Sequence, residues 1–94
     1  MKKKEATLLK YSAIMERDER LNVWHSALIN AILILGIRQG QDKIINVSRS
    51  RIMKLSCIAT LPTYHKYFRE LQEMGYIEYL PSYHPSYKST VKLL

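Results

Sequence analysis

Three histidines and one cysteine are the residues of this sequence whose types could bind a metal ion or take part in catalysis: His25, Cys57, His65 and His84. Their spacings match no zinc-ligand pattern, and a structural zinc site needs four ligands. The sequence also contains no glycine-rich phosphate loop, no Ser-His-Asp arrangement and no carboxylate pair beside a base. It therefore predicts a protein that is not an enzyme and that carries neither a metal site nor a cofactor.

The single cysteine and the apolar segments bear on the compartment. Cys57 has no partner cysteine in the chain, which fits a reducing cytoplasm, and we expect it to be a small buried hydrophobic residue in a turn. No apolar run follows the first lysines, so we expect no secretory signal. The longest apolar stretch, 27–37, is shorter than the ~20 residues that span a bilayer. A cytoplasmic protein without a membrane contact is expected.

Charge is distributed unevenly along the chain. The formal net charge is +7, from 15 Lys and Arg against 8 Asp and Glu, and no acidic residue lies between Asp42 and Glu70. A basic balance of this size indicates an anionic partner, either a nucleic acid or a membrane surface, although a solvated basic face would look the same. The basic residues of this window are Lys43, Arg49, Arg51, Lys54, Lys66 and Arg69.

The hydrophobic spacing of the first 40 residues predicts two helices. The first spans about 5–17, and the second runs from the N-cap Asn22 to about Leu35, before a break bracketed by Gly36 and Gly40. The second helix is apolar nearly all round, so it must be buried on more than one side. It would pack on the core and also on the N-terminal segment or a second subunit, and we therefore expect a homodimer.

The second half of the chain reads as a short helix, a turn, a longer helix and two strands. Ser48 is predicted to cap the short helix, Thr60 to cap the longer one with Pro62 in its first turn, and Gly75 to end it. The expected elements are an extended stretch at 43–47, a helix at 49–56, a turn at 57–59, a helix at 61–74, a strand at 76–80, a loop at 81–89 and a strand at 90–94.

This order is that of a winged helix. The segments 48–56, 63–66 and 75–85 (SRSRIMKLS, TYHK and GYIEYLPSYHP) resemble a family of small winged-helix proteins carried on bacterial mobile elements and usually called transcriptional regulators. Lys88 departs from the family, which has glycine before Ser89. The resemblance implies an α+β, mainly α fold: a winged helix-turn-helix with an added N-terminal helix and a two-stranded β-wing. Residues 1–20 would form a basic N-terminal tail and helical extension, and 21–94 the DNA-binding domain.

The face of the helix at 61–74 that would meet DNA follows from its buried stripe. Helical spacing places Leu61, Tyr64, Phe68 and Leu71 on the buried side. The opposite side is basic and polar in its first half and acidic in its second half, and a recognition helix contacts bases with its first half. The residues of that opposite side are Pro62, Thr63, Lys66, Arg69, Glu70 and Glu73. Thr63 and Lys66 are expected to contact bases, and Arg69 a base or a phosphate.

Further contacts are expected at helix N-termini and in the wing. Hydroxyls at helix N-termini suit phosphate oxygens, although capping alone would explain Ser48 and Thr60. In the wing, Lys88 is the best candidate for a phosphate contact, and Tyr83 and Tyr87 could equally pack the hairpin on the core. His84 and Ser86 could also lie against the DNA. The full set expected to bind DNA is Arg49, Ser50, Arg51, Thr60, Thr63, His65, Lys66, Arg69, Tyr83 and Lys88.

The sequence thus predicts sequence-specific binding of double-stranded DNA, in transcriptional regulation. The helix at 61–74 would enter the major groove, and the wing at 81–89 would lie on the backbone or in the minor groove. No small-molecule ligand is evident. Two alternatives stay open: a winged helix that binds an acidic protein partner, and an accessory DNA-binding protein of replication or mobilisation.

Overall fold

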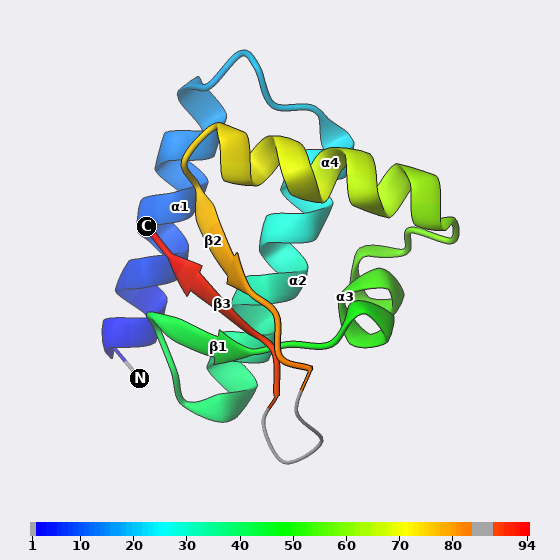
Figure 1. Ribbon diagram of the computed structural model, residues 1–94. Coiled ribbons are helices and arrows are strands. Elements are labelled where there is room, and N and C mark those ends of the chain that lie inside the picture. Colours follow the sequence, from blue (N-terminus) through cyan, green and yellow to red (C-terminus); the bar gives the residue numbers. More distant parts are fainter. Residues whose placement is uncertain (1, 84–87) are drawn as a thin grey trace.

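The fold is α+β and mainly helical, as predicted. The computed structural model describes residues 2–83 and 88–94, and their side chains from Leu9 onward. The elements are α1 (Lys2–Arg17), α2 (Val23–Gln39), β1 (Ile44–Asn46), α3 (Arg49–Ser56), α4 (Leu61–Glu73), β2 (Ile77–Leu80) and β3 (Thr90–Leu93). Figure 1 shows α2 in the middle of the molecule, with α4 crossing one end of it and the sheet beside it.

The sheet has three antiparallel strands in the order β1-β3-β2, which corrects the expected two-stranded ribbon. The stretch predicted only as extended pairs with β3, with Ile45 opposite Val91. The pairing is continued by a hydrogen bond of 2.9 Å from the backbone N–H of Val47 to the carbonyl oxygen of Ser89. Because α3 begins directly after Ser48, this pairing holds the start of α3 against the stem of the β2–β3 loop.

The core is built around α2, as its nearly uniform apolar composition predicted. Leu28, Ile29 and Ile32 have no exposed surface. The helix contacts α1, α3, α4 and β1 of its own chain. These neighbours account for the burial of α2 without a second copy of the chain. The apolar composition of α2 therefore does not require a dimer, and the homodimer stays a prediction. Asn22 caps the helix as expected, and its side chain accepts hydrogen bonds from the backbone N–H groups of Trp24 and His25.

The sequence suggested that the helix breaks at Gly36, but Gly36 lies inside α2. The helix continues to Gln39 and ends at Gly40, which adopts the left-handed conformation with φ 72°. A Cβ atom on Gly36 would lie 2.8 Å from the carbonyl oxygen of Gln41 and 2.8 Å from Cδ1 of Ile45. The missing side chain is therefore what lets the turn after α2 and the strand β1 approach the helix.

Two local predictions in the segment 57–61, for Cys57 and Leu61, were wrong, and one, for Thr60, was confirmed only in position. Cys57 is exposed at the C-cap of α3, where its backbone is left-handed with φ 60°, and the buried apolar side chain of this turn is Ile58. Thr60 is the N-cap residue of α4, as predicted, but its side chain makes no capping bond, since its hydroxyl donates to Oγ1 of Thr63 at 2.9 Å. Leu61 is 43% exposed, whereas the other three residues of the predicted stripe, Tyr64, Phe68 and Leu71, are buried.

Hydrogen bonds join α1 and the loop after it to the sheet. The hydroxyl of Tyr11 donates to the carbonyl oxygen of Leu94 at 2.8 Å, and the hydroxyl of Tyr76 donates to Oδ2 of Asp18 at 2.8 Å. Arg20 also binds this carboxylate, with Nη2 2.7 Å from Oδ2. Arg20, and then Tyr76, hold the pKa of Asp18 well below its usual range. Tyr11, from the predicted N-terminal extension, is buried in the same core as α2.

We predict that Gly36→Ala destabilises the protein even though alanine favours helices. The new Cβ would overlap backbone and a buried side chain, which costs about 1–3 kcal/mol and outweighs a propensity gain of about 1 kcal/mol. Urea unfolding should show a lower free energy of unfolding. Asn30→Ala, at an exposed position of the same helix, is the control and should raise it slightly. A stabilised Gly36→Ala variant would contradict the close approach.

The second prediction concerns acid stability. A carboxyl whose pKa is lower in the folded state stabilises that state above its unfolded pKa of about 4, and this contribution is lost as the pH falls toward the folded value. Between pH 5 and pH 2.5, wild type should therefore lose more stability in urea unfolding than Asp18→Asn. Tyr76→Phe, which removes one of the two bonds to Asp18, should lie between them. If the free energy of unfolding falls equally with pH in all three proteins, the bonds to Asp18 do not lower its pKa in the folded state.

Candidate nucleic-acid interface

Two adjoining hollows, one of them beside α4, form one groove. The first, with a volume of about 600 Å³, lies between α4, the start of α3 and β2, and the second, of about 460 Å³, lies between α3 and the stem of the β2–β3 loop. Both are lined by Ser48, Arg49 and Tyr79, so they adjoin at these residues. We call their combined lining the basic groove: Asn46, Val47, Ser48, Arg49, Ser50, Arg51, Tyr64, His65, Phe68, Arg69, Gln72, Tyr79, Ser82, Lys88 and Ser89.

The charge of the groove has one sign. Four Lys or Arg side chains and one histidine line it, and no carboxylate does. They come from α3, α4 and the end of the β2–β3 loop, so their convergence depends on the tertiary structure. Such a surface attracts anions, because like charges gathered in a concave site add their fields. The five residues are Arg49, Arg51, His65, Arg69 and Lys88.

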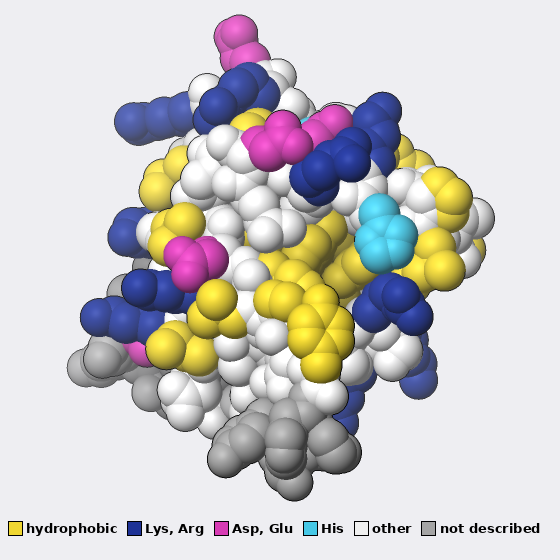
Figure 2. All heavy atoms as spheres, viewed as in Figure 1, with side chains coloured by type: hydrophobic (Ala, Val, Ile, Leu, Met, Phe, Trp, Pro, Cys, Tyr) yellow, Lys and Arg dark blue, Asp and Glu magenta, His cyan; other side chains and the backbone are white. Residues whose placement is uncertain are grey.

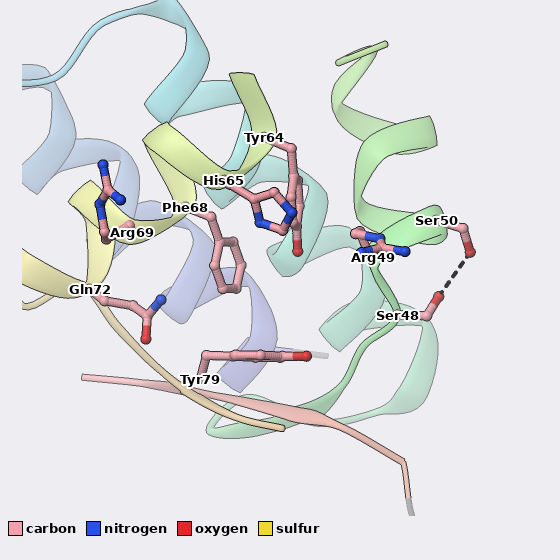
Figure 3. A pocket seen from close by; sticks show the side chains of 9 residues that line it. All are labelled: Ser48, Arg49, Ser50, Tyr64, His65, Phe68, Arg69, Gln72 and Tyr79. Carbon is pink, nitrogen blue, oxygen red and sulfur yellow. Dashed lines mark hydrogen bonds between the residues drawn. The ribbon is translucent and has the colours of Figure 1, made fainter. Parts of the chain in front are cut away.

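Three aromatic rings form the floor of the larger hollow. Phe68 stacks on Tyr64 with a centroid distance of 5.2 Å and meets Tyr79 edge to face at 5.2 Å. Figure 3 shows Phe68 pointing from α4 toward Tyr79, with Arg49 and His65 at the α3 side. Burial raises the pKa of Tyr64 to about 12. The phenol of Tyr64 is thus neutral near pH 7, and it does not neutralise the neighbouring Arg49.

The start of α3 is fixed by its cap. Ser48 Oγ accepts a hydrogen bond of 3.3 Å from the backbone N–H of Arg51 and lies 3.4 Å from Oγ of Ser50. No acidic residue occupies the first turn, where a helix favours negative charge. Arg49 and Arg51 are there instead, which the helix dipole disfavours.

The acidic residues of α4 lie toward its C-terminal end. Figure 2 shows magenta side chains above the hollow, over this end, and hydrophobic side chains in the hollow itself with basic ones at its margin. One acid reaches a groove residue: Oε1 of Glu73 lies 3.5 Å from Nε of Arg69. Both side chains are more than 60% exposed. Pairs this exposed contribute little, so Arg69 can exchange this partner for another anion.

Six of the ten residues predicted to bind DNA line the groove, and four lie elsewhere. Those in the groove are Arg49, Ser50, Arg51, His65, Arg69 and Lys88. Outside it, the hydroxyls of Thr60 and Thr63 bind each other. Lys66 Nζ lies 5.1 Å from the ring centroid of Tyr67. Tyr83 is 93% exposed, so it does not pack the hairpin on the core. His84, Ser86 and Tyr87 lie outside the described residues.

The orientation of α4 about its own axis explains why Thr63 and Lys66 do not line the groove. His25 Nδ1 accepts the backbone N–H of Asn22 at 3.0 Å, and its Nε2 is 2.7 Å from Oε1 of Glu70. The ring of Tyr67 meets His25 edge to face at 5.0 Å. These contacts turn the Tyr67–Glu70 side of α4 toward α2, although the sequence placed Glu70 on the outer face. The side toward the groove carries His65, Arg69 and Gln72 instead.

Sequence reasoning missed several polar groove residues. Gln72 follows His65 by seven positions and Arg69 by three, so all three share a helix face, and this spacing could have revealed it. Tyr79 could have been found from strand alternation. Asn46 reaches the groove through the pairing of β1 with β3, which no short-range pattern indicates. Ser82 and Ser89 meet at the stem of the β2–β3 loop, where the backbone N–H of Ser82 donates to Oγ of Ser89 at 3.0 Å.

Neither a metal site nor a membrane span is found in the described part of the chain. No three His, Cys, Asp or Glu side chains within it gather as metal ligands. His25 is engaged with Asn22 and Glu70, and Cys57 lies in an exposed turn. None of the described helices has both the length and the apolar character needed to cross a bilayer.

Comparison of the chain with protein-family models, curated proteins and solved structures finds no match. The resemblance to mobile-element regulators therefore stays a prediction, and the functional argument rests on the groove.

The groove predicts a position-dependent effect of charge on polyanion binding. Arg49→Gln should elute from a heparin column at a clearly lower salt concentration than wild type, because Arg49 lines both hollows. Arg17→Gln, on the exposed end of α1, changes the net charge equally and should shift elution less. Equal shifts would show that total charge, rather than the groove, governs binding.

Proposed function

We propose that the protein binds duplex DNA sequence-specifically, as a winged helix-turn-helix in which α3, the turn and α4 form the helix-turn-helix and the β2–β3 hairpin is the wing. The observation that carries the proposal is the basic groove: cations from the helix pair and the wing converge on one surface, and no carboxylate lines it. Regulation of transcription is the role that this binding would serve, on the resemblance in sequence.

In the proposed complex, α4 enters the major groove with the side that carries His65, Arg69 and Gln72. A glutamine amide can bind adenine N6 and N7 together, and an arginine can bind guanine O6 and N7. Gln72 has no charge, so its benefit from DNA lies in the hydrogen bonds that it makes to a base. We therefore assign base reading to these three residues. Lys66, which the sequence placed at a base, would lie beside the contact instead.

The remaining cations would position the protein on the backbone. Arg49 and Arg51, in the first turn of α3, and Lys88, at the end of the wing loop, lie on the far side of the groove from α4. Backbone contacts set register and orientation without selecting sequence. The partly exposed Tyr79 between the two sets would offer an apolar surface to a thymine methyl or a sugar.

The test separates reading from positioning. A preferred duplex is first selected from a random library, and binding to it and to a scrambled duplex is then titrated with salt. Gln72→Ala should lose about 1–3 kcal/mol on the selected duplex, lose little on the scrambled one, and leave the salt slope unchanged. Lys88→Gln should weaken both duplexes alike and lower the magnitude of the slope by about one.

Controls make the result specific. Gln41→Ala, an exposed glutamine outside the groove, should bind like wild type. If Gln72→Ala weakens both duplexes by the same factor, Gln72 does not read a base and the orientation of α4 in the complex is wrong. If wild type binds no duplex at low salt, the alternative of an acidic protein partner replaces the proposal.

A further inference from the structure

A second basic hollow lies on the other side of α3 from the groove. It has a volume of about 580 Å³ and is formed by the ends of α2 and α3. Three cations line it, and none of its lining residues is acidic. We call these three residues, Arg38, Arg51 and Lys54, the α2–α3 basic surface. Leu35, Gln39 and Leu55 complete the lining.

The position of this surface is fixed by the fold. Gln39 makes two hydrogen bonds to the backbone of Asn46, one donated by its Nε2 to the carbonyl oxygen at 2.6 Å and one accepted by its Oε1 from the N–H at 2.8 Å. These bonds hold the last turn of α2 against β1. Arg38 precedes Gln39 in the same turn, so its backbone is fixed relative to β1 before any ligand arrives.

The helix dipole explains only part of the arrangement. Arg38 lies in the last turn of α2 and Lys54 in the last turn of α3, where cations are favoured. Arg51 lies in the first turn of α3, where a cation is disfavoured, yet it lines the same hollow. Three like charges around one hollow repel one another, and a bound polyanion would relieve this repulsion.

Arg51 also lines the basic groove, so the two surfaces meet at this side chain. We propose that the duplex bound in the groove extends across α3, with Arg38 and Lys54 contacting phosphates beyond the segment that α4 reads. This inference rests on the proposed function. Its consequence is a longer site, in which the flank on the α2 side is bound whatever its sequence.

The experiment is a hydroxyl-radical footprint combined with a salt titration, on the selected duplex within flanking DNA. The Arg38→Gln/Lys54→Gln double variant should lose protection at one flank and keep the central protection. The magnitude of its salt slope should fall by about two, at ~0.9 per phosphate contact, and each single variant should lose about one. The conservative pair Arg38→Lys/Lys54→Arg keeps both charges and should keep the flank.

The control is Lys10→Gln/Arg17→Gln, which removes the same charge from exposed positions of α1. If the test variant matches this control in slope and footprint, the extension is wrong while the proposed function stands. Loss of central protection would also overturn it, since Arg38 and Lys54 would then act on the groove itself. If wild type protects no DNA, the proposed function fails and the extension fails with it.

Discussion

The pairing of β1 with β3 is the constraint on which the rest of the structure depends. It requires Ile45 to pack against α2 at Gly36, where any side chain would collide with it. Once β1 is in place, the backbone N–H of Val47 binds the carbonyl oxygen of Ser89, and α3 begins beside the stem of the β2–β3 loop. The placement of α3 in turn positions both basic surfaces, because Arg51, in the first turn of α3, lines both of them.

A second contact network decides which side of α4 is offered to a ligand. His25 caps α2 through one ring nitrogen and holds Glu70 through the other, so that one buried side chain links the start of α2 to the middle of α4. Tyr67 packs on the same imidazole and on Trp24. These contacts at Tyr67 and Glu70 turn one face of α4 toward α2, and His65, Arg69 and Gln72 therefore lie on the side toward the groove.

The positive charge of the groove depends on the distance of the carboxylates from it as much as on the number of its cations. The floor beneath the cations is aromatic, and the acids of α4 are placed on its other faces or at its far end. Asp18, the carboxylate with the most strongly lowered pKa among the described groups, is held by Arg20 and Tyr76 at the end of α1. Among the described residues, no carboxylate lines the groove, and the exposed pair of Arg69 with Glu73 is a weak one.

The sequence by itself determined the order of the elements, the burial of α2, the caps Asn22 and Ser48, and the basic window from which most groove residues come. These features depend on neighbours within a few positions, so composition and periodicity reveal them. Tertiary structure alone decided the third strand and the rotation of α4 about its own axis. Strand pairing between Ile45 and Val91 and the bond between His25 and Glu70 join residues 46 and 45 positions apart. Contacts at that separation leave no periodic trace in a single chain, and the position of a binding surface depends on them.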